Sequence, residues 1–359
     1  MKILHICNLS KSPFSGISVV VPQHIQAQSL ISDVFVWNLN GKKIDCKAKQ
    51  ICGNDFYSEK LDVDVVVFHG VYFYKYVKIG KILKKCGIPY IVFPHGSLTK
   101  VSLAQKRLKK LIANFLFFSK FIKDAAAVQF LTDNEKNTSL YCTKGFVCGN
   151  GVSIPAIKKS WDKLGNFRKF VYVGRFDVFH KGIDLLLDAV SLEKDFLRYN
   201  GFVLNLYGPN QKDVKQKTVD VHTILKRMIL QRKIDSIVHI NDAVYGDDKI
   251  ETLLKNDVFV QTSRFEGLPL GILEALSLGM PCLVTKGTNL DNLINECQAG
   301  WGVETSPKQI ACALKMAVQE SCMNLQKKSN SAQKVIEENY AWDIIAKKEI
   351  SIYKKLMIK

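Results

Sequence analysis

Short apolar segments alternate with longer amphipathic segments through nearly the whole of this 359-residue chain. In the first half, strands are predicted at residues 3–7, 34–37, 64–69, 89–93, 126–130 and 145–148, with helices between most of them. In the second half, strands are predicted at 169–174, 202–207, 237–240, 257–261 and 281–285, with helices that include 182–194 and 213–232. Parallel strands need a long crossover connection, so this order predicts an α/β protein with parallel sheets.

The alternation stops at Asn150-Gly151-Val152 and a polar segment, and it restarts at Lys169. A chain of this length exceeds the usual size of a single core. We therefore expect a doubly wound, Rossmann-like domain over 1–155, a second one over 156–338, and a final helical segment over 339–359. Ligands of such sheets bind beyond the carboxyl ends of the strands.

The balance of charge is strongly basic, with 51 Lys and Arg against 33 Asp and Glu. Such a surface attracts polyanions, which include nucleic acid, anionic lipid and phosphorylated substrates. The ten cysteines are scattered without a Cys-x-x-Cys pair, which favours reduced thiols in the cytoplasm. The first residues, Met1 to Cys7, resemble a strand more than a signal peptide, and no apolar run reaches the ~20 residues of a membrane span.

The segment from Asp257 to Gly279 carries the first indication of chemistry. A buried strand is followed by a turn that holds Glu266 and then by a helix that begins near Pro269 and holds Glu274. The two carboxylates should lie roughly 10 Å apart, with the helix N-terminus between them. Free N–H groups at that end favour a phosphate, and each carboxylate can accept from sugar hydroxyls. A nucleotide sugar has this layout. The same sequence pattern would also occur if Glu266 were an exposed turn carboxylate and Glu274 a solvated helix residue.

Two cations fall on the corresponding loop after an earlier strand. Gly174-Arg175 ends a strand, and Lys181-Gly182 begins the next helix. Arginine grips phosphate oxygens through paired N–H bonds, and lysine adds a point charge. Together they could neutralise a leaving diphosphate, or they could be ordinary surface cations of a basic chain.

These two features together resemble the GT-B retaining glycosyltransferases of family 4. The similarity covers nearly the whole chain and includes Asp64–Gly70, Asn150–Val152 and the terminal helix from Tyr340 to Tyr353. It implies a GT-B fold, in which two Rossmann-like domains face a cleft and the last helix crosses back to the N-terminal domain. The N-terminal domain would bind the acceptor, and the C-terminal domain would bind the nucleotide sugar.

The resemblance also implies roles for particular residues. Arg175 and Lys181 would hold the diphosphate, Glu266 would contact the donor sugar, and Glu274 would bind the ribose. Residues with catalytic roles would be Glu266, His95, Arg175 and Lys181. Donor-binding residues would be Gly16, Arg175, Lys181, Ala243, Val244, Glu266, Gly267, Leu268, Pro269, Leu270, Gly271, Ile272 and Glu274. The chain departs from the family pattern at Asp242 and Ser15, where glycine is more usual, and five residues separate Arg175 from Lys181.

The implied reaction is a front-face displacement through an oxocarbenium-like state, in which the leaving phosphate helps to take the acceptor proton. The donor would be a UDP- or GDP-sugar, and the acceptor a saccharide, lipid-linked, in surface polysaccharide biosynthesis. No cofactor or metal is expected, since no ligand-spaced cluster occurs. Asp62-Val-Asp64 directly precedes a buried strand and is interpreted as polarity at its entry.

The segment Lys100–Lys123 has apolar residues at helical spacing and cations concentrated in its first half. Such a helix can lie on an anionic membrane, each surface cation contributing ~1 kcal/mol. A core helix with a solvated basic face fits the same pattern. With a lipid-linked acceptor, we expect a cytoplasmic protein that is peripheral on the inner face of the membrane.

Other interpretations remain open on the sequence alone. A nucleic-acid-binding protein would match the charge, but no recognition helix or aromatic-basic motif stands out, and we expect no nucleic acid partner. An NAD-dependent oxidoreductase would need a Gly-x-Gly-x-x-Gly, which residues 8–16 lack. A sugar epimerase or a phosphorylase would share the fold. His95 and His69 each follow a strand and precede a glycine, where a histidine can also serve as a loop cap.

Overall fold

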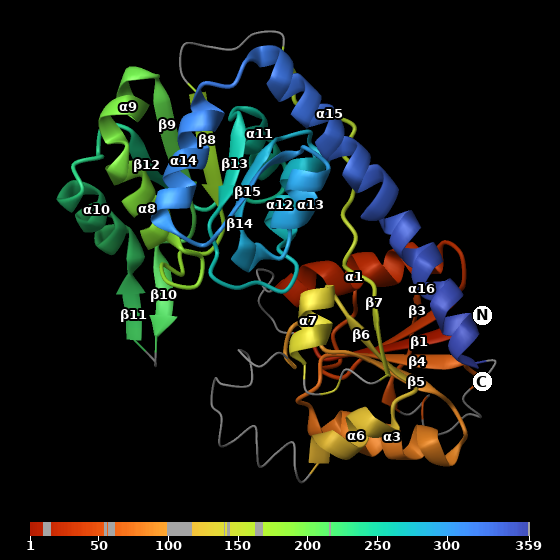
Figure 1. Ribbon diagram of the computed structural model, residues 1–359. Helices are drawn as coiled ribbons and strands as arrows, with labels where there is room; N and C mark the ends of the chain where they lie inside the picture. The colour runs from red at the N-terminus through yellow and green to blue at the C-terminus, as the bar shows by residue number, and fades with distance from the viewer. Residues whose placement is uncertain are drawn as a thin grey trace. The chain divides into compact units, whose positions relative to one another are not determined.

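The computed structural model describes residues 1–9, 16–53, 56, 62–98, 117–139, 141, 144–161, 168–214 and 217–357. The chain forms two compact units (Figure 1). Unit 1 consists of Met1–Gly151 and Tyr340–Lys359, and unit 2 is Val152–Asn339.

Unit 1 is built on a parallel sheet of seven strands in the order β3-β2-β1-β4-β5-β6-β7. Its strands are β1 (Lys2–Cys7), β2 (Asp33–Asn38), β3 (Lys49–Gln50), β4 (Val65–His69), β5 (Tyr90–Phe93), β6 (Ala127–Phe130) and β7 (Gly145–Val147). The central strands are buried on both faces; every residue of β4, for example, is buried. Near-continuous apolar runs of this kind are typical of parallel strands covered by helices on both sides.

The helices of unit 1 cover both faces of this sheet. Figure 1 shows α1 (Gly16–Ser29) and α16 (Trp342–Met357) on one face, and α3 (Tyr74–Lys85) and α6 (Ser119–Asp124) on the other. Helix α16 packs directly against α1, and its Ile345, Ala346 and Ile350 are buried. The end of the chain therefore returns to the N-terminal unit, as the resemblance to GT-B enzymes implies.

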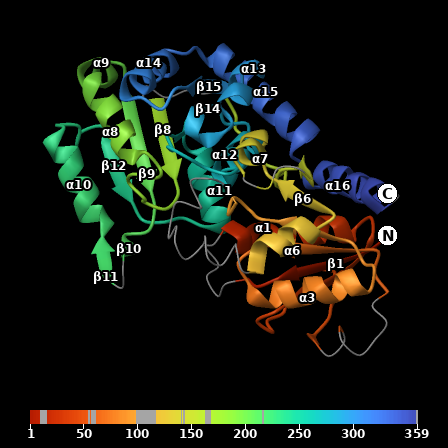
Figure 2. The same ribbon diagram turned by 60° about the horizontal axis from the view of Figure 1, so that its bottom comes forward.

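Unit 2 has a second parallel sheet, of six strands, in the order β12-β9-β8-β13-β14-β15. Its strands are β8 (Arg168–Val173), β9 (Phe202–Tyr207), β12 (Val238–Asn241), β13 (Val258–Gln261), β14 (Cys282–Thr285) and β15 (Gly300–Val303). Figure 2 shows β12, β9 and β8 side by side. The helices are α8 (Ile183–Leu192), α9 (Lys194–Tyr199), α10 (Val221–Gln231), α11 (Gly246–Leu254), α12 (Leu270–Ser277), α13 (Asp291–Glu296), α14 (Pro307–Val318) and α15 (Cys322–Asn339).

The helix predicted over 213–232 is wrong in its first part. The strands β10 (Gln211–Val214) and β11 (Lys217–Asp220) pair antiparallel, and the helix begins only at Val221. The carboxylate of Asp220 accepts from the backbone N–H of Thr223 at 2.9 Å and caps this helix. An aspartate at that position is a strong signal for a helix start, so the boundary was present in the sequence.

In each sheet the order in which successive strands are added reverses at one point. In unit 1 the change lies between β1 and β4, and in unit 2 between β8 and β13. Loops that leave neighbouring strands at such a point diverge to opposite faces and open a crevice at the carboxyl edge. Each unit therefore presents one preferred position for a ligand.

Among the described helices, none combines the length and the apolar character needed to span a membrane. The basic helix predicted within Lys100–Lys123 falls mostly on residues 99–116, which lie outside the described residues. Of the remainder, Ser119–Asp124 is helical, with Phe121 and Ile122 buried and Lys120 and Lys123 exposed.

Candidate functional site

The loops that leave β8 and β13 in unit 2 bring together the cations and the carboxylate singled out from the sequence. Lys181 donates to Oε1 of Glu266 at 2.6 Å, and their side chains are only 14% and 11% exposed. Arg175, the second residue after β8, is exposed, and within the described part of the chain no carboxylate pairs with its guanidinium. One cation is therefore neutralised inside the protein, and the other remains available to an anion.

Glu266 is held by more than its ion pair. The same oxygen, Oε1, accepts from Oγ of Ser263 at 2.8 Å and from Nε2 of Gln261 at 3.1 Å. Asn289 donates to the backbone carbonyl of Glu266 at 2.6 Å. A carboxylate that accepts several hydrogen bonds in a partly buried setting has a fixed position, so it can serve as a rigid acceptor for ligand hydroxyls.

The two loops are joined tightly by their backbones. The hydroxyl of Thr262 donates to the carbonyl of Gly182 at 2.8 Å. Gly182 has φ +62°, and a Cβ atom there would lie 1.9 Å from the carbonyl oxygen of Thr262. Arg264, the next residue but one, makes a two-point ion pair with Asp184 in which both N···O distances are 2.7 Å. These contacts fix the position of Lys181 relative to Glu266.

The helix α12 begins at the same edge of the sheet. Its N-cap, Pro269, offers no side-chain hydrogen bond, and the first turn carries no acidic residue. The backbone N–H groups of Leu270 and Gly271 therefore lie at a helix N-terminus without a side-chain cap, which favours an anion. The side chains of Leu268 and Ile272 are buried in the core, so only their backbones are placed to contact a ligand.

Glu274 lies in α12, one turn beyond the helix start, and forms an ion pair with Lys249 of α11. The two side chains are 35% and 24% exposed, so both remain open to exchange with a ligand. Ala243 and Val244 are half-buried in the loop between β12 and α11, at the carboxyl edge of the same sheet. Every unit 2 residue of the predicted donor set thus belongs to one edge of one sheet or to the start of α12.

His95 lies at the carboxyl edge of the other sheet, in unit 1. It follows β5 with φ +49°, a left-handed conformation that is uncommon for a residue other than glycine. Its ring stacks on Phe93 with 3.8 Å between centroids, and its Nε2 lies 3.0 Å from Nδ1 of His69. Desolvation lowers the pKa of half-buried His95 to about 3, and repulsion from His24 adds to this effect. Strain that surrounding contacts maintain is often found at functional positions.

The loop that carries His95 is held by a buried carboxylate. Glu135 of α7 (Asp133–Thr138) accepts from the N–H of Gly96 and from the N–H of Leu131, both at 2.7 Å. Burial raises the pKa of Glu135, and the two backbone hydrogen bonds oppose that rise. Thr132 caps the start of α7 by accepting from the N–H of Glu135. The ends of β5 and β6 are thereby tied together beside His95.

Four of the seven histidines of the chain gather in unit 1. His5 of β1, His24 of α1 and His69 of β4 have ring nitrogens within 4.8 Å of one another, a spacing that could hold a metal ion. No spacing rule reveals this group, because 19 and 45 residues separate its members. Local spacing in the sequence alone predicts no metal site, and that absence stays a prediction.

Two further sequence assignments belong to unit 1. Gly16 is the first residue of α1 and is exposed, with open space around it, and the loop before it lies outside the described residues. Asp64 accepts from the backbone N–H of Lys2 at 2.7 Å, and Asp62 pairs with the Lys2 ammonium. Both aspartates therefore lie at the amino end of the sheet, which supports their interpretation as strand-entry polarity.

Sequence reasoning missed three contributors in unit 2. Gln261 and Ser263 bind Glu266, and Lys249 binds Glu274. Gln261 and Ser263 are polar residues at the end of an apolar strand, close to Glu266 in sequence, so their position was a usable signal. Lys249 lies 25 residues before Glu274, and only the fold brings the two together.

Comparison with known proteins places the chain among glycosyltransferases. Residues 153–341, more than half of the chain, match the family model "Glycosyl transferases group 1". An uncharacterized glycosyltransferase of Methanocaldococcus jannaschii is 26% identical over 252 residues, which cover 67% of this chain and 59% of that protein. The match thus spans less than two thirds of that relative's length.

Solved structures of the same fold match over almost the entire chain. HepE of Anabaena in complex with UDP has a TM-score of 0.75 at 15% identity, covering 99% of this chain and 100% of the other. A sucrose-phosphate synthase of Thermosynechococcus elongatus has a TM-score of 0.72 at 14% identity, with full coverage of both chains. The trehalose-6-phosphate enzyme of E. coli bound with UDP-2-fluoro glucose has a TM-score of 0.68 at 14% identity, covering 99% of each chain. These likenesses, with the two parallel sheets, confirm the GT-B fold, and the family match shows that the chain belongs to the glycosyl transferases group 1 family.

Proposed function

We propose that this protein transfers a sugar from a nucleoside-diphosphate sugar to a saccharide acceptor. The observation that carries the proposal is the arrangement at the carboxyl ends of β8 and β13. There, Arg175, Lys181 and the uncapped N-terminus of α12 offer positive charge to a diphosphate, and Glu266 and Glu274 offer acceptors to hydroxyls. Family membership and the UDP complexes of similar structures support the same assignment.

Each group in unit 2 has a proposed task. Arg175 holds the diphosphate, together with Lys181 once the ammonium turns from Glu266 toward the phosphate. Ser263 and Gln261 continue to donate to Glu266, so that carboxylate keeps its place and accepts from the donor sugar.

The rest of the donor set follows the same layout. The backbone from Gly267 to Ile272 contacts sugar and phosphate, Glu274 binds the ribose, and Ala243 and Val244 meet the base. In unit 1, His95 contacts a sugar hydroxyl, and Gly16 allows close backbone approach to the phosphates.

For the chemistry, we propose retention of the anomeric configuration by front-face displacement, the outcome of the family 4 enzymes that the motifs resemble. Arg175 and Lys181 stabilise the charge that builds on the leaving diphosphate, which is the task that a metal ion has in other phosphate-binding enzymes. We therefore propose that no metal is required. The donor is proposed to be a UDP-sugar, because two of the similar structures hold UDP or a UDP-sugar.

The acceptor proposal is a lipid-linked saccharide of a surface polysaccharide, at the inner face of the membrane. Its support is the net charge of +18 and the basic amphipathic pattern of Lys100–Lys123. A vesicle assay tests this part by itself. Flotation with anionic vesicles but not with neutral ones supports it, and equal behaviour with both contradicts it.

The first experiment measures the melting temperature of the protein with UDP, GDP, ADP, CMP and NAD, each with and without EDTA. A ligand that binds only the native state adds about 2.7 kcal/mol at 100 times its dissociation constant. We expect stabilisation by UDP, unchanged by EDTA and lost in Arg175→Ala. Lys255→Ala is the matched control, because this lysine lies on unit 2 but is 68% exposed and pairs with Glu251, four residues earlier in the chain. Stabilisation by NAD alone contradicts the proposal.

A further inference from the structure

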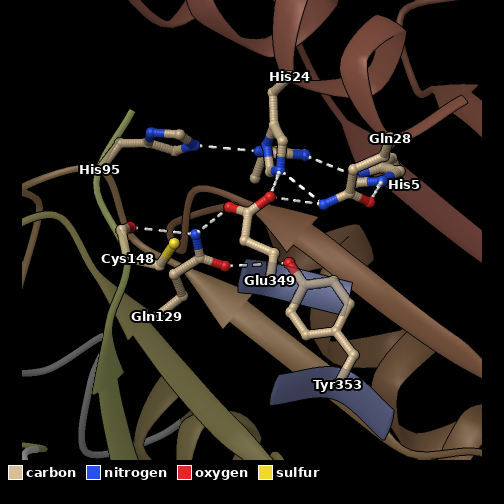
Figure 3. A network of polar contacts seen from close by, with 9 residues as sticks. His5, His24, Gln28, His95, Gln129, Cys148, Glu349 and Tyr353 are labelled. Carbon is tan, nitrogen blue, oxygen red and sulfur yellow. Dashed lines mark hydrogen bonds and ion pairs between the residues drawn. The ribbon is translucent and has the colours of Figure 1, made fainter. Parts of the chain in front are cut away.

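A buried polar network in unit 1 runs from His95 to the C-terminal helix α16 (Figure 3). Its members are His5, His24, Gln28, His69, His95, Gln129, Cys148, Glu349 and Tyr353. All are buried except His95, which is half-buried. Since buried polar groups are costly unless bonded, the donor and acceptor of each contact can be worked out from one fixed point.

The fixed point is the backbone carbonyl of Cys148, which can only accept. Gln129 places Nε2 at 3.2 Å from that carbonyl, so the amide nitrogen must face it. Its Oε1 then accepts from the hydroxyl of Tyr353 at 3.0 Å. The second N–H of the same amide donates to Oε1 of Glu349 at 2.6 Å. Glu349 is thereby established as an acceptor in the network.

The other oxygen of Glu349 orients a second amide. Nε2 of Gln28 donates to it at 2.7 Å, and Nε2 of His24 approaches it at 2.6 Å. The two nitrogens are 2.8 Å from each other, and the shorter contact assigns the His24 proton to the carboxylate. Whether the amide N–H of Gln28 donates to Glu349 or to His24, the amide nitrogen faces these two groups. The amide oxygen of Gln28 therefore faces His5.

This oxygen determines the proton positions of two further rings. Oε1 of Gln28 lies 3.0 Å from Nε2 of His5, which must therefore carry a hydrogen. Burial lowers the pKa of His5 to about 3 and that of His69 well below its usual value, so both rings are neutral at pH 7. Nδ1 of His5 is then an acceptor, and Nε2 of His69 donates to it at 2.9 Å. By the same rule Nδ1 of His69 accepts, at 3.0 Å, from Nε2 of His95.

We propose that Gln28, His5 and His69 are positioning residues that hold the proton of His95 on Nε2, so that Nδ1 accepts a hydrogen bond from a hydroxyl of the sugar substrate. Figure 3 shows Nδ1 on the side of the ring that points away from the network. No group among the described residues is bonded to it. The Phe93 stack and the left-handed backbone fix the ring plane. The proposal rests on the proposed function, which supplies the hydroxyl.

The same histidines could instead hold a metal ion, and the distances favour the hydrogen bonds. Nδ1 of His5 and Nε2 of His69 lie 2.9 Å apart, the usual length of a hydrogen bond between nitrogens. Two nitrogens bound to one tetrahedral zinc at ~2.0–2.1 Å would be roughly 3.3–3.4 Å apart. Among the residues that the structure describes, none hydrogen-bonds to the buried Nδ1 of His24, so the test includes zinc directly.

The experiment records long-range ¹H–¹⁵N correlation spectra of the full-length protein at pH 7, with ¹⁵N-labelled histidine. We expect His5, His69 and His95 to be neutral, with the hydrogen on Nε2. Gln28→Met removes the fixed acceptor, and we expect His95 to become a mixture of both tautomers. His24→Phe is the matched control, because it removes one donor to Glu349 but leaves Gln28 in place, and we expect no change at His95.

The chain of hydrogen bonds from Gln28 through His5 and His69 to His95 is called the relay below. Several results would overturn it. In the wild type, a hydrogen on Nδ1 of His95 or a doubly protonated ring contradicts it without any variant. Stoichiometric binding of added zinc that shifts the His5 and His69 nitrogens contradicts it as well. An unchanged His95 in a folded Gln28→Met protein is the third such result, and His5→Phe repeats the test if Gln28→Met does not fold.

The substrate part of the proposal has its own measurement. Saturating UDP-glucose, UDP-galactose or UDP-N-acetylglucosamine should shift the ¹⁵N signal of His95 Nδ1, whereas UDP alone should not. If a UDP-sugar stabilises the protein but the signal does not move, the acceptor role of Nδ1 is wrong. If no nucleotide binds and the tautomers are as expected, the proposed function fails while the relay stands.

Discussion

Lys181 and Glu266 form an ion pair that joins the loops after β8 and β13, with 2.6 Å between Nζ and Oε1. Each side chain is the other's counter-ion, and both are mostly buried. Ser263 and Gln261 donate to the same carboxylate oxygen, so Glu266 stays bonded if the ammonium moves away. This arrangement supports the proposed exchange, in which the Lys181 ammonium turns to a diphosphate and the carboxylate of Glu266 stays in position.

We predict a strong coupling between these two residues. Glu266→Ala leaves the Lys181 cation partly buried without its partner, which should cost about 3 kcal/mol of unfolding free energy. The double variant with Lys181→Met should recover part of that loss. A double-mutant cycle by urea unfolding measures the coupling, and purely additive single effects contradict the prediction. The exposed pair Lys286–Glu304, both 64% exposed, is the control and should show no measurable coupling.

Gly182 and Gly246 allow a matched test of the loop geometry. Both have positive φ, +62° and +53°, and both lie at the start of a helix in unit 2. Gly246→Ala meets open space, so it should cost about 1 kcal/mol for the backbone conformation alone. Gly182→Ala adds a collision with the carbonyl of Thr262, so it should cost clearly more and weaken UDP binding. Equal losses of stability in the two variants would show that the loops adjust freely.

Most of the fold could be predicted from the sequence, because short continuous apolar runs alternate with longer segments of helical period, and this alternation is a strong signal for parallel α/β sheets. The β10–β11 hairpin was not recovered. Its residues, 211–220, are mainly polar and charged, so their pattern did not distinguish a hairpin from the first turns of a helix. The capping Asp220 could have corrected the boundary.

The site was predicted to the extent that its residues are close in sequence or end a strand. Arg175, Lys181 and Glu266 satisfy this condition, because parallel strands place their carboxyl ends at one edge. The ion pair between Lys249 of α11 and Glu274 of α12 depends on where the fold places the two helices, which no local pattern contains. The histidine network could not be predicted for the same reason, because its contact between His24 and Glu349 joins residues 325 positions apart in the chain.

Glu274 is predicted to recognise the ribose rather than the phosphates. Glu274→Gln should weaken UDP binding roughly tenfold, because a charge-assisted hydrogen bond contributes about 1.5–3 kcal/mol. It should scarcely change the binding of 2′,3′-dideoxyuridine diphosphate, which lacks the hydroxyls. Isothermal titration of the wild type and the variant with both ligands gives the comparison. Arg175→Ala is the reference, and it should weaken both ligands equally; an equal loss in Glu274→Gln contradicts a ribose contact.

The buried histidines also predict how unit 1 responds to acid. The folded pKa of His5 is lowered to about 3, and that of His69 lies well below the usual 6.5. A histidine whose pKa is lowered by folding binds fewer protons in the folded state than in the unfolded state. The protein therefore loses stability as the pH falls below about 6.5. Glu135 acts in the opposite direction, because burial raises its pKa. A comparison of variants removes that contribution, since Glu135 is common to all of them.

The wild type loses free energy of unfolding between pH 7 and pH 5. We predict that this loss is about 2 kcal/mol smaller in His69→Phe, because the variant takes up one fewer proton on unfolding. Urea unfolding followed by tryptophan fluorescence at several pH values gives the two curves. His239→Gln is the control, because this histidine is exposed on unit 2 and its removal should leave the slope unchanged. Only the slope is compared, so any loss of stability from the substitution itself does not enter. Parallel curves for wild type and His69→Phe would mean that His69 takes up its proton without unfolding, and the neutral relay to His95 would then fail at mildly acidic pH.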